Sequence, residues 1–197
     1  MGRVVGDSLQ WVAQQVRGCT RCRLSGSRTH AVPGAGPPEA PLVLVGEGPG
    51  SAEDATGRPF QGAAGRFLDD VLAQLGVQRS RLFLTSMVKC RPPGNRTPRA
   101  DELAACRGYL DRQLRLVTAR AVLAMGATAA AQLHPSARRA AVRVGDLRGR
   151  PATLSRGTRL LVTYHPAAAM RFPARREPFR RDLAAACRLA GLLPARG

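Results

Sequence analysis

Short, continuous apolar runs alternate with amphipathic stretches along this 197-residue chain. Four apolar runs have the length of buried strands and lie within residues 42–50, 81–88, 120–126 and 159–166. Apolar residues spaced three and four apart predict helices over 8–17, 63–75, 97–116, an alanine-rich stretch up to Leu133, and 176–193. Strands of this kind alternating with helices are typical of a parallel sheet covered on both faces. We therefore predict an α/β protein, a three-layer α/β/α fold with a central four-stranded parallel sheet, in a single domain over 1–197.

Polar segments that follow three of the predicted strands are expected to meet at one edge of the sheet. They are the glycine turn "GEGPG" at 46–50, Ser86, and "YHP" at 164–166. In parallel sheets the ligand crevice lies beyond the carboxyl ends of the strands. We therefore expect the functional site at this edge.

The glycine turn has the composition of a site that receives a ligand. Gly46 and Gly48 allow close approach of the backbone and leave N–H groups that suit a phosphate or a carbonyl. The chain has neither a G-x-G-x-x-G motif nor a P-loop lysine, which argues against a nucleotide cofactor. Glu47 has two interpretations: a solvated turn residue, or a carboxylate that positions water.

Phe60 and His165 also have two interpretations each. Phe60 lies in the Gly/Pro loop "GRPFQGAAG", where it either folds back onto the core or offers a stacking platform for a base. His165 follows a strand and precedes a proline, so it either donates a hydrogen bond to a developing anion or caps the next turn. We expect His30 and His134 to be structural or solvated.

Four of the five cysteines suggest a metal centre. Cys19 and Cys22 form a C-x-x-C pair, Cys90 lies in a loop of proline, glycine and arginine, and Cys106 lies in the helix that follows. Four thiolates suit either zinc or an iron–sulfur cluster, and the spacing does not separate the two. A thioredoxin-type pair is disfavoured because this C-x-x-C does not stand between a strand and a helix. Cys187 shares an apolar helix stripe, and we expect it to be buried.

The charge of the chain points to a polyanionic partner. Thirty-one basic residues against thirteen acidic ones give a net charge of +18, which favours nucleic acid or an anionic surface. No run of about 18 apolar residues is present, and the N-terminus lacks an apolar signal core. We therefore expect a cytoplasmic, nucleoid-associated protein that does not enter a membrane, and a monomer.

Five blocks of the sequence, in this order, resemble the family 4 uracil-DNA glycosylases. They are "CTRC", "GEGPGSAEDATGRPFQGAAG", "VKCRPPGNRTP", Cys106 and "TYHPAAAMR", and they cover roughly residues 19–172. The resemblance implies a uracil-glycosylase fold, hydrolysis of the N-glycosidic bond between uracil and deoxyribose in DNA, and a role in base excision repair. It also implies a structural 4Fe–4S iron–sulfur cluster on Cys19, Cys22, Cys90 and Cys106.

The resemblance further implies roles for residues of the predicted site. Phe60 would stack on the flipped base, and His165 would stabilise the uracil oxygen together with N–H groups of the turn at Gly46 and Gly48. Glu47 would position the attacking water and help to balance the cationic sugar. Contacts with phosphates, or with the vacated base stack, would come from Arg91, Arg96, Arg99, Arg171, Met170 and Phe172.

One position departs from the family pattern. The family usually has asparagine where this chain has Ser86, and an asparagine amide can pair with the uracil edge at two points. Serine offers one hydroxyl and a shorter reach, so we expect slower uracil excision or a substrate range shifted toward other deaminated bases. The Arg/His-rich insertion of the sister group that links covalently to DNA does not follow "VKCRPPGNRTP", so we expect a hydrolase that turns over freely.

Two other classes of protein also explain the charge. One is a nucleic-acid-binding homologue that has lost catalytic activity through Ser86, and the other is a zinc-ribbon-like interaction protein. Neither explains why "GEGPG", Phe60 and His165 all fall at one edge of the predicted sheet.

Overall fold

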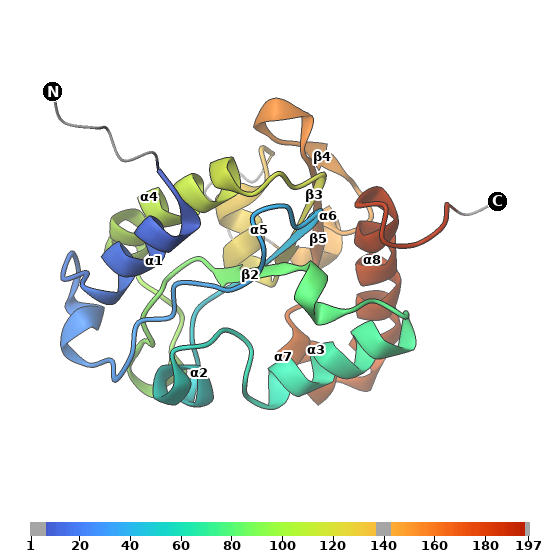
Figure 1. The fold of residues 1–197 in the computed structure, drawn as a ribbon. Helices are drawn as coiled ribbons and strands as arrows, with labels where there is room; N and C mark the ends of the chain where they lie inside the picture. The colour runs from blue at the N-terminus through green and yellow to red at the C-terminus, as the bar shows by residue number, and fades with distance from the viewer. Residues whose placement is uncertain (1–6, 137–142, 196–197) are drawn as a thin grey trace, which may run out of the picture.

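A mixed sheet lies between two layers of helices in the computed structural model, which describes residues 7–136 and 143–195 (Figure 1). Its strands are β1 (Leu42–Gly46), β2 (Phe83–Ser86), β3 (Ala121–Met125), β4 (Ala152–Thr153) and β5 (Arg159–Thr163). The spatial order is β2-β1-β3-β5-β4, and all neighbours are parallel except β4 and β5. The α/β class and the four parallel strands are confirmed. The antiparallel edge strand β4 was missed because two residues are too few to show a hydrophobic pattern.

Helices make up the rest of the regular secondary structure in the described ranges. The α-helices are α1 (Leu9–Arg17), α2 (Ser51–Thr56), α3 (Ala63–Gln74), α4 (Ala100–Leu116), α5 (Ala127–Leu133), α6 (Val144–Leu147), α7 (Pro166–Arg171) and α8 (Arg176–Leu189). Single 3₁₀ turns lie at Arg23–Gly26, Arg79–Arg81, Pro93–Asn95, Ser155–Gly157 and Pro173–Arg175. None of the helices in the described ranges has the length and apolar content needed to cross a bilayer.

The side chains of β1 alternate between two apolar layers, as expected for a sheet that is buried on both faces. Leu42 and Leu44 pack with Phe179 of α8 in the layer that also contains α3 and α7. Val43 packs on the opposite face with Leu110 of α4. The strand register pairs Gly46 with the last residue of β2, so the carboxyl ends of these strands lie at the same edge.

A third apolar cluster joins the N-terminal helix to α4, away from the sheet. Val12 and Val16 of α1 pack with Tyr109 of α4, and the cluster includes Cys90 and Cys106. Helices α1 and α4 lie side by side (Figure 1). This packing places the C-x-x-C segment, which follows α1 directly, beside the other two cysteines of the predicted metal centre.

Candidate active site and cysteine cluster

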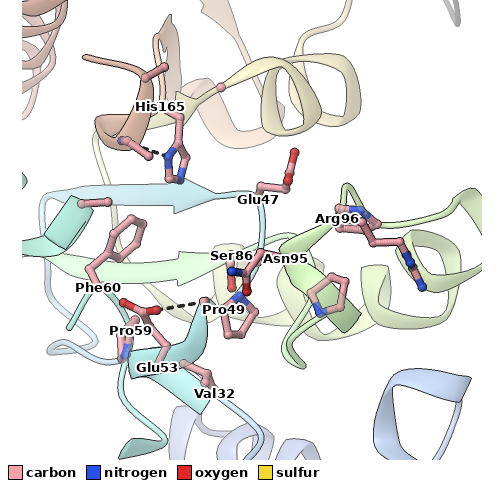
Figure 2. Close-up of a pocket in the computed structure, with 18 of the residues that line it drawn as sticks. Val32, Glu47, Pro49, Glu53, Pro59, Phe60, Ser86, Asn95, Arg96 and His165 are labelled. Carbon is pink, nitrogen blue, oxygen red and sulfur yellow. Dashed lines mark hydrogen bonds between the residues drawn. The ribbon is translucent and has the colours of Figure 1, made fainter. Parts of the chain in front are cut away.

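A cavity of about 470 Å³ opens at the carboxyl ends of β1, β2 and β5 (Figure 2). The predicted site residues that line it are Glu47, Gly48, Phe60, Ser86, Arg96, His165, Arg171 and Phe172. Gly46 lies just beneath it, while Arg91, Arg99 and Met170 are not among its lining residues. The parallel topology therefore brings the three polar segments together at one site.

The Phe60 ring forms one wall of this cavity and is held by two glycines. Phe60 is only 9% exposed and has a positive φ of 54°, and its ring belongs to the sheet core while facing the cavity. A Cβ atom at Gly46 would lie 2.8 Å from Phe60 Cζ, and one at Gly65 would lie 2.0 Å from the Phe60 carbonyl oxygen. Any side chain at either glycine would therefore displace Phe60.

Glu53 holds the loop that carries Phe60. Its carboxylate accepts hydrogen bonds from the backbone N–H groups of Gly50 (2.9 Å), Gln61 (2.7 Å) and Gly62 (2.8 Å). Two of these donors follow Phe60 directly, so Glu53 fixes the loop to the start of α2. Sequence reasoning missed Glu53; its only signal was its position three residues after a glycine that caps a short helix.

His165 acts both as a helix cap and as a donor toward the cavity. Its Nδ1 accepts the backbone N–H of Ala167 (3.2 Å) at the start of α7. Nδ1 is therefore unprotonated, and Nε2 carries the proton of the neutral ring. A Cβ atom at Gly46 would lie 3.5 Å from Nε2, so this N–H lies beside the end of β1. The imidazole lies 6.3 Å from the Phe60 ring between centroids.

The imidazole of His165 is neutral at physiological pH. Burial lowers its pKa to about 4, and the nearby Glu53 carboxylate opposes this shift only in part. His165 thus offers the cavity a hydrogen-bond donor without a full positive charge.

The side chain of Glu47 is anchored on its far side by α5. The hydroxyl of Thr128 donates to Glu47 Oε2. Figure 2 shows Glu47 at the end of β1, on the same side of the cavity as His165. Thr128 is a second residue that sequence reasoning missed, because nothing in the alanine-rich stretch links it to a turn 81 residues earlier.

The hydroxyl of Ser86 is engaged within its own turn. It donates to the carbonyl of Val88 (2.8 Å), and the residue is buried at the cavity wall. Ser86 therefore closes the end of β2 without a free donor directed at the cavity. The hydroxyl that was expected to meet the base edge is thus already engaged, and the effect of position 86 on base recognition stays a prediction.

The arginine loop between β2 and α4 is itself held by a buried carboxylate. Arg96 donates two hydrogen bonds to Glu102 (2.8 and 2.6 Å), and Glu102 is fully buried. These bonds lower the Glu102 pKa to about 2. Arg91 donates to Asn95 (2.7 Å), while Arg99 is exposed. Of the three arginines predicted to contact phosphates, Arg96 is thus already paired with a buried carboxylate.

Two exposed apolar side chains lie at the end of α7, and one of them, Phe172, lines the cavity. Met170 and Phe172 are 37% and 46% exposed, which is unusual for side chains of this size. The guanidinium of Arg175 lies 4.5 Å from the Phe172 ring centroid and 5.2 Å from that of Tyr164. The Arg175 guanidinium therefore packs against the Phe172 ring, while part of the ring stays exposed to solvent.

The four predicted cysteine ligands surround one small cavity between α1 and α4. It is lined by Cys19, Cys22, Cys90 and Cys106. Among residues 7–136 and 143–195, no three His, Cys, Asp or Glu side chains are close enough to hold a single metal ion. The four thiols that line this cavity nevertheless form the donor set that an iron–sulfur cluster or a zinc ion takes.

Comparison with known proteins shows the family to which this fold belongs. Residues 33–186 match the model of the uracil DNA glycosylase superfamily. The chain is 42% identical over 179 residues to a type-4 uracil-DNA glycosylase from Pyrobaculum aerophilum, an alignment that covers 89% of this chain and 91% of the relative. It is 38% identical to a type-4 uracil-DNA glycosylase from Thermotoga maritima, over 84% of both chains. It is 35% identical to a type-5 uracil-DNA glycosylase from Thermus thermophilus, over 82% of this chain and 81% of the relative. The chain therefore belongs to the type-4 uracil-DNA glycosylases within this superfamily.

Proposed function

We propose that this protein hydrolyses the N-glycosidic bond of uracil in DNA and so begins base excision repair. The observation that carries the proposal is the neutral His165, whose Nε2–H lies beside Gly46 at the base of a cavity walled by Phe60. Family membership supports the same reaction, since the relatives named above are uracil-DNA glycosylases.

The first step is extrusion of the uridine from the base stack into the cavity. Unstacking and unpairing cost a few kcal/mol. Phe60 offers a ring face on which the base can stack, and its rigid loop keeps that face in place. The exposed Met170 or Phe172 would fill the gap left in the duplex, and Arg171 would contact a phosphate.

Cleavage of the glycosidic bond places negative charge on the departing uracil. The Nε2–H of His165 would donate to the uracil oxygen on which this charge gathers, together with N–H groups of the Gly46–Gly48 turn. A preorganised donor of this kind contributes about 10²–10³-fold to the rate. Because the ring is neutral, it keeps its proton and is not consumed as an acid.

Glu47 acts on the sugar side of the bond. Its carboxylate would orient the attacking water and help to balance the oxocarbenium-like sugar, with Thr128 holding one of its oxygens in place. Water supplies the hydroxyl that ends on the sugar carbon, and its proton leaves with the released uracil.

We also propose that Cys19, Cys22, Cys90 and Cys106 hold a 4Fe–4S cluster. The cluster would join the segment after α1 to the arginine loop, and its role would be structural. Among the arginines of this loop, Arg91 and Arg99 would contact phosphates, whereas Arg96 bonds to Glu102 of α4.

The test is single-turnover release of base from oligonucleotides that contain uracil, hypoxanthine or xanthine. Wild-type protein should release uracil, and His165→Ala should lower the rate by about 10²–10³-fold without loss of DNA affinity. His134→Gln is the matched control, because His134 ends α5 and does not line the cavity. An iron-loaded wild-type protein that releases no base would contradict the proposed activity, and a zinc-loaded, colourless one would contradict the proposed cluster.

Release of hypoxanthine or xanthine faster than uracil would support a second function. The observation in its favour is the engaged hydroxyl of Ser86, which leaves the end of β2 without a donor for the uracil edge. The same assay decides between the two substrate ranges.

A further inference from the structure

Lys89 is the only lysine of the chain, and its side chain is almost completely buried. Its ammonium donates to the hydroxyl of Thr85 (2.6 Å), the carbonyl of Ser86 (2.7 Å) and the side-chain oxygen of Gln113 (2.8 Å). All three acceptors are formally neutral. Gln113 is held in turn by its own bond to the carbonyl of Pro33.

A buried cation needs a counter-charge, and no carboxylate supplies one to Lys89. In the described part of the chain, no ion pair of an Asp or Glu involves this lysine. An uncompensated buried charge is costly. The nearest candidates for negative charge are the thiols of the proposed cluster.

Lys89 lies directly against that cysteine set. Its backbone N–H donates to Cys106 Sγ (3.3 Å), and the next residue is Cys90. On the outer side, the guanidinium of Arg28 donates to Cys90 Sγ (3.0 Å) and to the carbonyl of Arg17 (3.0 Å). Three cationic residues, Arg21, Arg28 and Lys89, thus line the cysteine cavity, and of these only Lys89 is buried in the interior.

The opposite side of Lys89 faces the candidate active site. The Ser86 carbonyl that accepts from its ammonium belongs to the last residue of β2, and Ser86 lines the cavity. Arg28 has no such second contact, and it is not among the cavity-lining residues. Lys89 thus bonds the end of β2 through its ammonium and Cys106 through its backbone N–H.

We propose that Lys89 is a counter-cation shared by the cluster and the base pocket. It balances the negative charge of the four thiolates with their cluster, and the same ammonium holds the end of β2 in the position that receives the base. Lys89 is a positioning residue, since it acts through Ser86 and the cysteines. The inference rests on the proposed cluster and the proposed glycosylase function.

Two consequences follow from this placement. One-electron reduction adds a negative charge to the cluster, so a nearby cation favours the reduced form and raises the midpoint potential. Removal of Lys89 or of Arg28 should therefore lower the potential. Only removal of Lys89 should also disturb base binding, because only Lys89 contacts the β2 end.

The experiment compares Lys89→Met, Arg28→Met and Arg81→Met in the iron-loaded, full-length protein. Arg81 is an exposed residue at the opposite end of β2 and controls for the loss of one positive charge. The readouts are iron per chain, the midpoint potential from a dithionite titration followed by EPR, and affinity for an oligonucleotide that carries the non-cleavable 2′-fluoro-2′-deoxyuridine.

We expect Lys89→Met and Arg28→Met each to weaken electron affinity by about tenfold, which corresponds to about 59 mV for one electron. Affinity for the fluorinated probe should fall by about tenfold in Lys89→Met, and in Arg28→Met it should change no more than affinity for undamaged DNA does. Arg81→Met should leave the potential unchanged. Its affinity for the probe should fall only as much as its affinity for undamaged DNA, because the lost charge weakens both equally.

Gln113→Glu provides a second test if Lys89→Met does not fold. The substitution is nearly isosteric and places a carboxylate beside the ammonium, so it should lower the potential although the lysine remains. Wild-type potential and probe affinity in both Gln113→Glu and any folded Lys89 variant would overturn the proposal. Failure of the proposed function looks different, because wild-type protein would then lack iron or would not distinguish the probe from undamaged DNA.

Discussion

At the scale of single residues, His165 shows how one hydrogen bond fixes both position and chemistry. The bond from the Ala167 N–H to Nδ1 caps α7 and leaves the proton on Nε2. The two interpretations of His165 in the sequence were thus compatible, because a ring has two nitrogens and each performs one role.

The protonation state of His165 can be measured directly. We expect its imidazole to remain the Nε2–H tautomer and to titrate near pH 4, because burial lowers its pKa to about 4. Between the ordinary histidine pKa of 6.5 and this value, the unfolded chain takes up a proton that the folded chain does not. The His165 contribution to stability is therefore complete above about pH 6.5 and declines as the pH falls toward 4. Two-dimensional ¹H–¹⁵N NMR of the three histidine rings, with His165→Gln for assignment, tests this; a His165 titration near 6.5 would contradict it.

Position 86 gives a prediction about substrate choice. Ser86→Asn should raise the rate of uracil excision by about tenfold or more, since a two-point contact with a base edge contributes about 1–3 kcal/mol. The added amide has space because position 86 lies at the cavity wall. The measurement is single-turnover excision of uracil and hypoxanthine from matched duplexes, with Ser86→Ala as the control for loss of the hydroxyl bond to Val88. An unchanged ratio of the two rates in Ser86→Asn would show that this position does not select the base.

At the scale of elements, long periodic segments were predictable and short ones were not. Helix α3 spans Ala63–Gln74 where apolar spacing predicts 63–75, because its stripe alone specifies the buried face. Helix α2 has six residues without such a stripe and begins where Glu53 bonds back to the Gly50 N–H. Strand β4 has no pattern of its own and depends on its pairing with β5.

The candidate site follows the same division. Parallel topology alone places Glu47, Ser86 and His165 at one edge, so the sequence could predict their meeting. The contacts that hold them include distant ones: Thr128 bonds to Glu47, 81 residues away, and Lys89 bonds to Gln113, 24 residues away. No local pattern records such a contact.

The loop between β2 and α4 contains two kinds of arginine, and they should respond differently to substitution. Arg96→Met removes both side-chain hydrogen bonds to the buried Glu102 carboxylate, which keeps the Arg99 backbone N–H (2.8 Å) and the Arg23 guanidinium at 4.0 Å. The loss should lower the free energy of unfolding by about 1–3 kcal/mol at neutral pH. Glu102 has a lowered pKa, so this contribution is present above about pH 4.5 and is lost as the pH falls toward 2. Urea unfolding at pH 7 and pH 3 measures both parts.

Arg99→Met is the matched variant in the same loop. Arg99 is exposed and forms no ion pair within the described ranges, so its loss should leave stability within about 0.5 kcal/mol of wild type. It should instead reduce the salt slope of DNA binding by about 1, as expected for one lost phosphate contact. Equal effects of the two variants on stability would refute the division between structural and DNA-contacting arginines.

At the scale of the whole molecule, the net charge of +18 and the proposed cluster would act together. The charge attracts DNA without regard to sequence. The four cysteines bring together segments 19–22 and 90–106, which are far apart in the chain, and the second of these segments carries the arginine loop. We therefore expect the charge to attract DNA from any direction, and the fixed arginine loop to determine how the bound DNA is oriented.

Removal of the cluster should loosen one part of the molecule and spare the other. In Cys106→Ser we expect amide exchange to rise by at least tenfold over residues 9–28 and 88–106, because a small apolar cluster and partly exposed polar contacts such as Arg23–Asp101 are then the connections left there. Strands β1 and β3 should keep their protection, since their core lies between α4 and α8 and contains no cluster ligand. Cys187→Ala is the control: Cys187 lies in that sheet core, so its loss should weaken α8 while iron content stays at the wild-type level. Hydrogen exchange read by mass spectrometry distinguishes the two patterns, and a uniform rise in Cys106→Ser would mean that the cluster supports the entire fold.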